Sequence, residues 1–140
     1  MSVFNGVLRA HDKLYKATDG RVGHRLLGVP TLLLRTTGRR SGVERTNSLV
    51  YARDGADYLL VASKGGDDRP PAWLLNLEAK PEVEIQIGRE RQKGRCKVVY
   101  PSDPDYERLW KIVNEENGDR YARYQKLTSR PIPVVAVTPV

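Results

Sequence analysis

The chain has few of the residues that build covalent or metal-based sites. Its 140 residues include one cysteine, Cys96, and two histidines, His11 and His24. A single cysteine cannot form an internal disulfide, which favours a reducing compartment. These three residues cannot supply a Cys/His zinc set, and they disfavour a Ser-His-Asp triad. We therefore expect no metal site.

Long apolar runs are also absent. None approaches the roughly 20 residues that cross a bilayer, and the N-terminus lacks the cationic start, apolar centre and small-residue cleavage site of a signal peptide. With 140 residues, of which 39% are hydrophobic, the chain is long enough to bury a core. We expect one domain over residues 1–140, located in the cytoplasm.

The chain has more basic than acidic residues. Lysine and arginine number 24 against 17 acidic residues, which gives a formal net charge of +7. Such a surface favours an anionic partner, namely nucleic acid, an anionic membrane surface or a multiply charged cofactor. It also serves solubility alone, so the charge does not choose between these functions.

Apolar periodicity predicts the secondary structure. An amphipathic helix is expected over residues 1–20, packed on the body of the protein or touching a membrane. Strands are expected at 31–35, 44–52, 58–63, 82–87, from 89 to about 100, and 132–137. Further helices are expected at 72–79, after Pro104 and around Tyr121. Because strands and helices do not alternate, we expect a mainly β (α+β) fold, a six-stranded, mostly antiparallel barrel with three or four flanking helices.

Residues 36–42, Thr-Thr-Gly-Arg-Arg-Ser-Gly, follow the apolar run 32–34 and form the most informative stretch. A tight turn of this composition can cradle a phosphate, since its amides supply positive dipole and arginine supplies paired donors. The spacing is not that of a P-loop. The alternative is a charged hairpin turn whose glycines adopt positive φ.

A second basic feature alternates along the strand expected after residue 88. Its members are Arg89, Arg91, Lys93, Arg95 and Lys97, which share one face wherever the chain is extended. This face is either solvated on an edge strand or a patch for an anionic ligand or nucleic acid. It lacks the interleaved aromatics of a single-strand binder, so we expect no nucleic-acid partner.

Three segments together resemble one family. They are residues 33–42, residues 62–66 with 71–81, and residues 121–133. In order and spacing they are similar to the deazaflavin (F-420)-dependent nitroreductases of the split β-barrel flavin/deazaflavin oxidoreductase superfamily, over nearly all of residues 22–140. The resemblance implies a split barrel that binds coenzyme F-420, an 8-hydroxy-5-deazaflavin with a phosphodiester and an oligoglutamate tail.

The resemblance also implies site residues. The cofactor-binding positions are Gly38, Arg39, Arg40, Ser41, Arg45, Asn47, Ser63, Lys64, Gly65, Trp73 and Asn76. Gly38, Arg40 and Ser41 would hold the phosphate with support from Arg45. Asn47, Ser63 and Lys64 would contact the ring and linker, and Trp73 and Asn76 would line the same groove. Tyr121 and Tyr124 would face the substrate.

The activity that the resemblance implies is hydride transfer from the reduced coenzyme to an electron-poor small molecule, such as a quinone, an enone or a nitro compound. The alternatives are an FMN-binding split-barrel oxidoreductase and a deazaflavin carrier without turnover. Four positions, Ser48, Val50, Leu74 and Gly118, depart from the family's pattern and count against bicyclic nitroimidazoles as substrates. We expect a monomer or weak dimer, with membrane contact through the N-terminal helix as a further interpretation.

Overall fold

The computed structural model describes residues 25–26 and 29–140. The helix expected over residues 1–20 lies outside these ranges. The described elements are β1 (Arg25–Leu26), β2 (Val29–Thr37), β3 (Glu44–Val50), β4 (Ala52–Asp54), β5 (Asp57–Val61), the 3₁₀ turn η1 (Lys64–Gly66), α2 (Ala72–Ala79), β6 (Glu82–Ile87), β7 (Glu90–Val99), α3 (Tyr106–Glu116), α4 (Arg120–Gln125) and β8 (Val134–Pro139).

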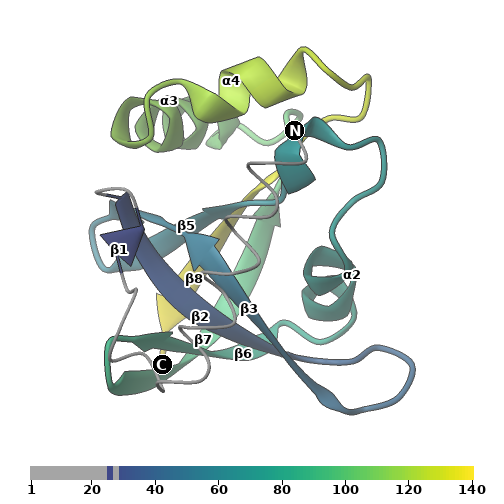
Figure 1. The fold of residues 1–140 in the computed structure, drawn as a ribbon, viewed down its shortest axis with the longest axis vertical. Coiled ribbons are helices and arrows are strands. Elements are labelled where there is room, and N and C mark those ends of the chain that lie inside the picture. Colours follow the sequence, from purple (N-terminus) through teal and green to yellow (C-terminus); the bar gives the residue numbers. More distant parts are fainter. Residues whose placement is uncertain (1–24, 27–28) are drawn as a thin grey trace.

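The strands close into a barrel whose described pairs are all antiparallel. The hydrogen-bonded order is β2-β6-β7-β8-β5-β4, and β3 pairs with the other edge of β2. Only Tyr51 separates β3 from β4, so one segment pairs with β2 in its first part and with β5 in its second. When β3 and β4 are taken as one strand, six strands complete the ring (Figure 1). The predicted six-stranded antiparallel barrel is confirmed.

Side-chain alternation divides the core in two. Tyr58 and Leu60 of β5 point into the barrel, whereas Leu59 and Val61 pack in a second cluster with α3 and α4. Because β5 is covered on both faces, its sequence is a continuous apolar run. Helix α2 adds Trp73, Leu74 and Leu77 to the cluster inside the barrel, and in Figure 1 it lies along one side of the strands.

Helix α3 covers the barrel because its apolar residues recur on one face. Tyr106, Leu109 and Val113 are spaced at i, i+3 and i+7 and are all buried. Tyr106 also donates its hydroxyl to the Ile132 carbonyl at 2.6 Å, which ties the start of α3 to the entry of β8. No helix in residues 25–26 and 29–140 combines the length and the hydropathy needed to cross a bilayer.

Some details differ from the sequence prediction, among them the neighbours of β7 and the ends of two strands; the strand predicted at 132–137 is β8 (Val134–Pro139). The basic strand β7 is not an edge strand, because it pairs with β6 on one side and β8 on the other. The strand predicted at 58–63 ends at Val61, and Lys64–Gly66 form the turn η1. Periodicity identifies a strand but not its neighbours, which depend on how the sheet closes.

Candidate functional site

The β2–β3 hairpin folds residues 38–43 into a tight turn. The Gly38 amide donates to the Val43 carbonyl at 2.8 Å, and the Gly42 amide donates to the Gly38 carbonyl at 2.9 Å. A Cβ at Gly38 would lie 2.8 Å from Ser41 Oγ and 2.9 Å from the Val43 carbonyl oxygen. The turn therefore needs glycine at position 38, and it leaves Arg39 and Arg40 exposed.

Asn76 fastens this turn to helix α2. Its Oδ1 accepts hydrogen bonds from the Arg39 amide at 3.1 Å and from Arg39 Nη1 at 3.0 Å, and its Nδ2 donates to Thr36 Oγ1 at 3.3 Å. The Asn76 side chain is buried at 4% exposure. Both its polar atoms are thus satisfied inside the protein, and the hairpin is held in one orientation relative to α2.

The register of β2 and β3 places two predicted residues on the inward face of the hairpin. Arg45 lies opposite Thr36, and Asn47 lies opposite Leu34. Directly opposed side chains share a face, and Leu34 is buried in the barrel with the apolar residues of α2. Arg45 and Asn47 therefore project on the side where α2 packs, whereas Arg35 on the other face pairs with Glu44 and Glu84.

The turn η1 forms the second part of the site. Ser63 is buried, and its carbonyl accepts the Gly66 amide at 2.9 Å. Lys64 is exposed and adopts φ +46°, a conformation that residues with a side chain rarely hold. Such strain costs about 1–3 kcal/mol and persists only where neighbouring contacts impose it. In Figure 1 the hairpin, α2 and η1 follow one another along the same side of the barrel.

Exposed cations lie on this side of the barrel. Arg40 and Arg45 are exposed, and neither forms an ion pair with the described carboxylates. At η1, the Arg69 amide and then the charge of Lys64 hold the pKa of Asp67 below its usual value. Two exposed guanidiniums beside backbone amides form a donor set suited to an oxyanion.

The two tyrosines lie on α4. Tyr121 is buried among the residues between α3 and the barrel, and burial raises the pKa of Tyr121 to about 12. Tyr124 is half-buried, and burial raises its pKa as well. Their ring centroids are 6.3 Å apart in an edge-to-face arrangement. Of the two tyrosines, Tyr124 is therefore the more exposed.

The chain was compared with known proteins. The family model described as "F420H(2)-dependent quinone reductase" matches residues 7–139. An F420H(2)-dependent quinone reductase of Mycobacterium tuberculosis is 58% identical over 133 residues, 94% of this chain and 89% of that protein. The chain belongs to the F420H(2)-dependent quinone reductase family. It is an enzyme, and the family's cofactor is coenzyme F-420, which selects this coenzyme over FMN.

Solved structures agree with this family membership. The F420-H2 dependent reductase FDR-A is 36% identical, has a TM-score of 0.69 and covers 77% of this chain and 93% of its own. A structure described as a domain-swapped dimer is 33% identical, has a TM-score of 0.71 and covers 89% of this chain and 92% of its own. The split-barrel fold and the F-420-dependent oxidoreductase activity implied by the resemblance are confirmed.

The structure separates the predicted residues of this reductase into two groups. Arg40, Ser41, Arg45 and Lys64 are exposed, whereas Trp73 and Asn76 are buried in contact with the barrel core and the hairpin. The side chain of Arg39 is engaged by Asn76. Among the described residues, no group of three or more His, Cys, Asp or Glu side chains could hold a metal ion.

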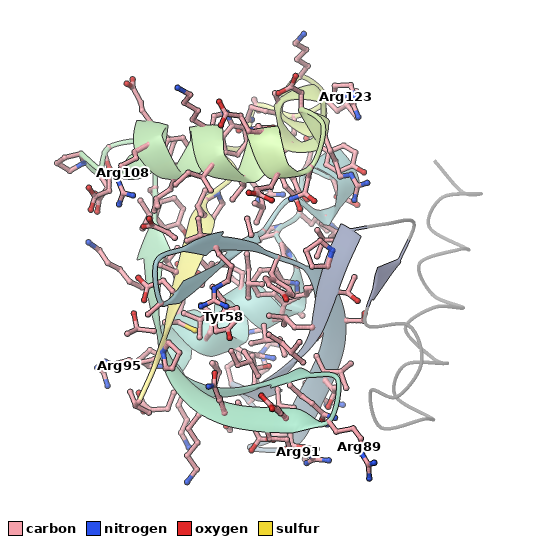
Figure 2. All side chains as sticks on the ribbon, turned by 90° about the vertical axis from the view of Figure 1, so that its left-hand side faces the viewer. Tyr58, Arg89, Arg91, Arg95, Arg108 and Arg123 are labelled. Atoms are coloured by element: carbon pink, nitrogen blue, oxygen red, sulfur yellow. The ribbon has the colours of Figure 1, made fainter. Side chains whose placement is uncertain are left out.

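The basic face of β7 is largely neutralised by its neighbours. Arg95 lies opposite Glu82 and pairs with it at 3.3 Å, Arg91 pairs with Glu84 at 3.6 Å, and Lys97 pairs with Asp103 at 3.5 Å. Figure 2 shows Arg89 and Arg91 near the β6–β7 turn, well separated from Arg95. Paired charges attract phosphate weakly, and the absence of a nucleic-acid partner stays a prediction.

Three residues that contact the site were not predicted as functional. Thr36 accepts the Asn76 amide, Gln125 organises the loop after α4, and Arg130 binds the carbonyls around η1. All three lie within segments that carried the family resemblance. Thr36 and Arg130 have partners 40 or more residues away, which no pattern in their own segments reveals, whereas Gln125 bonds within its own loop.

Proposed function

We propose that this enzyme transfers a hydride from reduced coenzyme F-420 to a quinone, with the coenzyme held across the β2–β3 hairpin and η1. The observation that carries the proposal is the set of three hydrogen bonds made by the Asn76 side chain. They fix the turn that bears two exposed arginines against α2. Relatives that are 58% identical are named quinone reductases, which favours a quinone over an enone or a nitro compound.

The phosphate would lie in the hairpin turn. Gly38 permits close approach of the backbone, Ser41 offers a hydroxyl, and Arg40 and Arg45 offer guanidiniums that no described carboxylate neutralises. The oligoglutamate tail adds negative charge that these exposed cations can attract. The residues present therefore fit this coenzyme.

The ring and linker would lie between Asn47 and η1. Ser63, Lys64 and Gly65 present polar groups from one side, and Asn47 does so from the inward face of β3. Trp73 and Asn76 are buried, so they support this arrangement through the packing of α2 and not through an exposed surface. When bound, the reduced coenzyme supplies the hydride, and the protein contributes proximity and orientation.

The reduced acceptor also needs a proton. Proton transfer is most efficient when the donor's pKa lies near the working pH, so Tyr121, with its pKa raised to about 12, is a poor acid at neutral pH. Tyr124 is more accessible and lies on the same helix. We propose that Tyr124 orients the acceptor or a water molecule, and that Tyr121 supports it by packing.

The test is a fluorescence titration of oxidised coenzyme against the wild type, Arg40→Ala, Lys64→Ala and the double variant. We expect each single change to raise the Kd about tenfold, and the double change to raise it further, because a charge-assisted hydrogen bond contributes about 1.5–3 kcal/mol. Arg108→Ala on α3 is the control, since Arg108 lies away from the hairpin and forms an ion pair with Asp54, with 2.9 Å between Nη1 and Oδ1.

Turnover is then measured with a panel of quinones, enones and nitroarenes. The proposal predicts that quinones are reduced fastest and that bicyclic nitroimidazoles are poor substrates. Equal coenzyme affinity in the wild type and the Arg40/Lys64 double variant would refute the assigned cradle. Preferred reduction of a nitroarene would refute the quinone assignment.

A further inference from the structure

Arg130 binds the backbone of the turn that carries Ser63 and Lys64. Its Nη1 donates to the Ala62 carbonyl at 3.1 Å, and its Nη2 donates to the Ser63 carbonyl at 3.0 Å. Its Nε and Nη2 donate to the Asp67 carbonyl at 3.2 and 3.1 Å. One guanidinium thus joins carbonyls on both sides of η1, although Arg130 is more than 60 residues away in the chain.

The loop that presents Arg130 is itself fixed. Gln125 Oε1 accepts the Ile132 amide at 2.9 Å, and Gln125 Nε2 donates to the Arg130 carbonyl at 2.8 Å. Thr128 Oγ1 donates to Asp68 Oδ1 at 2.6 Å, which adds a second link between this loop and the chain after η1. The backbone of residues 125–132 is therefore held at both ends.

Helix α4 packs directly on the turn. A Cβ at Gly66 would lie 2.7 Å from the Tyr124 carbonyl oxygen and 3.0 Å from Leu127 Cβ, and Gly66 has φ +85°. The turn therefore has no room to relax toward α4. Arg130 and this packing together restrain the turn in which Lys64 holds its strained φ of +46°.

We infer that Arg130 is a positioning residue for the coenzyme: its guanidinium holds η1 in the conformation that presents Ser63 and Lys64. The inference rests on the proposed function. A planar guanidinium with five N–H donors can bridge several carbonyls, whereas a lysine ammonium on a flexible stem cannot reproduce the fork. Since these bonds direct the N–H groups at the protein backbone, Arg130 acts through the turn and not on the coenzyme.

The decisive variants are Arg130→Lys and Arg130→Ala, with Arg123→Ala as the matched control. Arg123 lies on α4, is exposed, and donates to the Gly118 carbonyl at 2.7 Å within its own helix–turn unit. Figure 2 shows it on the helical layer that covers the barrel. The measurements are the coenzyme Kd by fluorescence, kcat at saturating coenzyme, and thermal stability.

We expect Arg130→Ala to raise the coenzyme Kd about tenfold, as Lys64→Ala does, because a displaced Lys64 loses the same charge-assisted contact. Arg130→Lys keeps the charge but should still raise the Kd several-fold. The kcat at saturating coenzyme should fall less than the affinity does, since Arg130 touches no reacting atom. Arg123→Ala should bind like the wild type.

A double-mutant cycle separates positioning from direct attraction. If Arg130 acts through the turn, Arg130→Ala should raise the Kd by a smaller factor in the Lys64→Ala background than in the wild type, because the contact that Arg130 positions is already missing there. Fully additive effects of Arg130→Ala and Lys64→Ala would overturn the inference. So would wild-type affinity in Arg130→Lys, which remains decisive if Arg130→Ala fails to fold.

The inference can fail while the proposed function survives. Weakened binding in Arg40→Ala and Lys64→Ala together with unchanged binding in both Arg130 variants would exclude the positioning role alone. Failure of the wild type to bind the coenzyme would instead exclude the proposed function.

Discussion

Asn76 shows how one buried amide can orient a binding loop. Its three hydrogen bonds join α2 to the Arg39 backbone, the Arg39 guanidinium and Thr36, residues 37 and 40 positions away. We expect Asn76→Ala to lower the free energy of unfolding by about 2–3 kcal/mol, since it leaves buried partners unsatisfied. Urea denaturation measures this change, and the coenzyme Kd should rise in the same variant.

Lys80→Ala is the matched control for Asn76. Lys80 is exposed at the C-terminal end of the same helix, and its side chain forms no hydrogen bond or ion pair with a described residue. Its substitution should change stability by less than about 0.5 kcal/mol. If Asn76→Ala unfolds at the same urea concentration as Lys80→Ala, the hairpin is not held by this amide.

At the same scale, the sequence predicts which residue types gather at the site better than it predicts what each one does. The composition of residues 36–42 indicated a turn with exposed arginines, and the structure confirms it. It could not reveal that Arg39 donates to Asn76 while Arg40 does not, because the two arginines are exposed neighbours of the same type. Their difference arises from the packing of α2, which is a tertiary effect.

At the scale of elements, the β2–β3 hairpin depends on two glycines for different reasons. Gly38 has no room for a Cβ, whereas Gly42 has open space around it but adopts φ +72°. We expect Gly38→Ala to raise the coenzyme Kd more than Gly42→Ala does, because it displaces Ser41 and the Val43 backbone. Gly42→Ala should cost mainly backbone strain, about 1 kcal/mol of stability.

Paired titrations and urea melts of these two variants test the prediction. The comparison is internal, since both substitutions add one methyl group to the same turn. A coenzyme affinity that falls equally in both variants would mean that backbone strain, and not the shape of the cradle, controls binding.

Most elements followed from local patterns. The helix predicted at 72–79 and the strand predicted at 82–87 match α2 (Ala72–Ala79) and β6 (Glu82–Ile87), because proline flanks and strict alternation are local signals. The break at Tyr51 and the turn η1 were not predicted. The break arises where the chain changes its pairing partner from β2 to β5, and η1 arises where the chain packs on α4. No pattern in the nearby residues predicts either condition.

At the scale of the whole molecule, closure of the barrel joins parts of the site that are distant in sequence. Residues 44–54 bridge β2 and β5, so the hairpin that follows β2 and the turn that follows β5 share one framework. The number and type of the expected strands predicted a barrel, but only the structure shows which strands pair to close it. Long-range register is set by the burial of whole faces and not by any single segment.

Burial across the whole fold makes its stability sensitive to alkaline pH. Burial raises the pKa of Tyr121 and of Tyr106 from 10.0 to about 12, and that of the half-buried Cys96 from 9.0 to about 12. The folded state therefore keeps protons that the unfolded chain releases. These groups leave stability unchanged below about pH 9, and stability falls as the pH rises from there toward 12.

Each such group can contribute a slope of about 1.4 kcal/mol per pH unit. We expect urea midpoints of the wild type to be constant from pH 7 to 9 and to fall steeply above pH 10. Tyr121→Phe removes one titrating group, and the Tyr121 hydroxyl forms no hydrogen bond with a described residue. Its stability should therefore differ from the wild type by a fixed amount up to about pH 9.5, and the decline above pH 10 should be shallower. Parallel curves for the two proteins up to pH 11 would show that Tyr121 ionises as freely in the folded state as in the unfolded chain, and that the layer of α3 and α4 admits water to its ring.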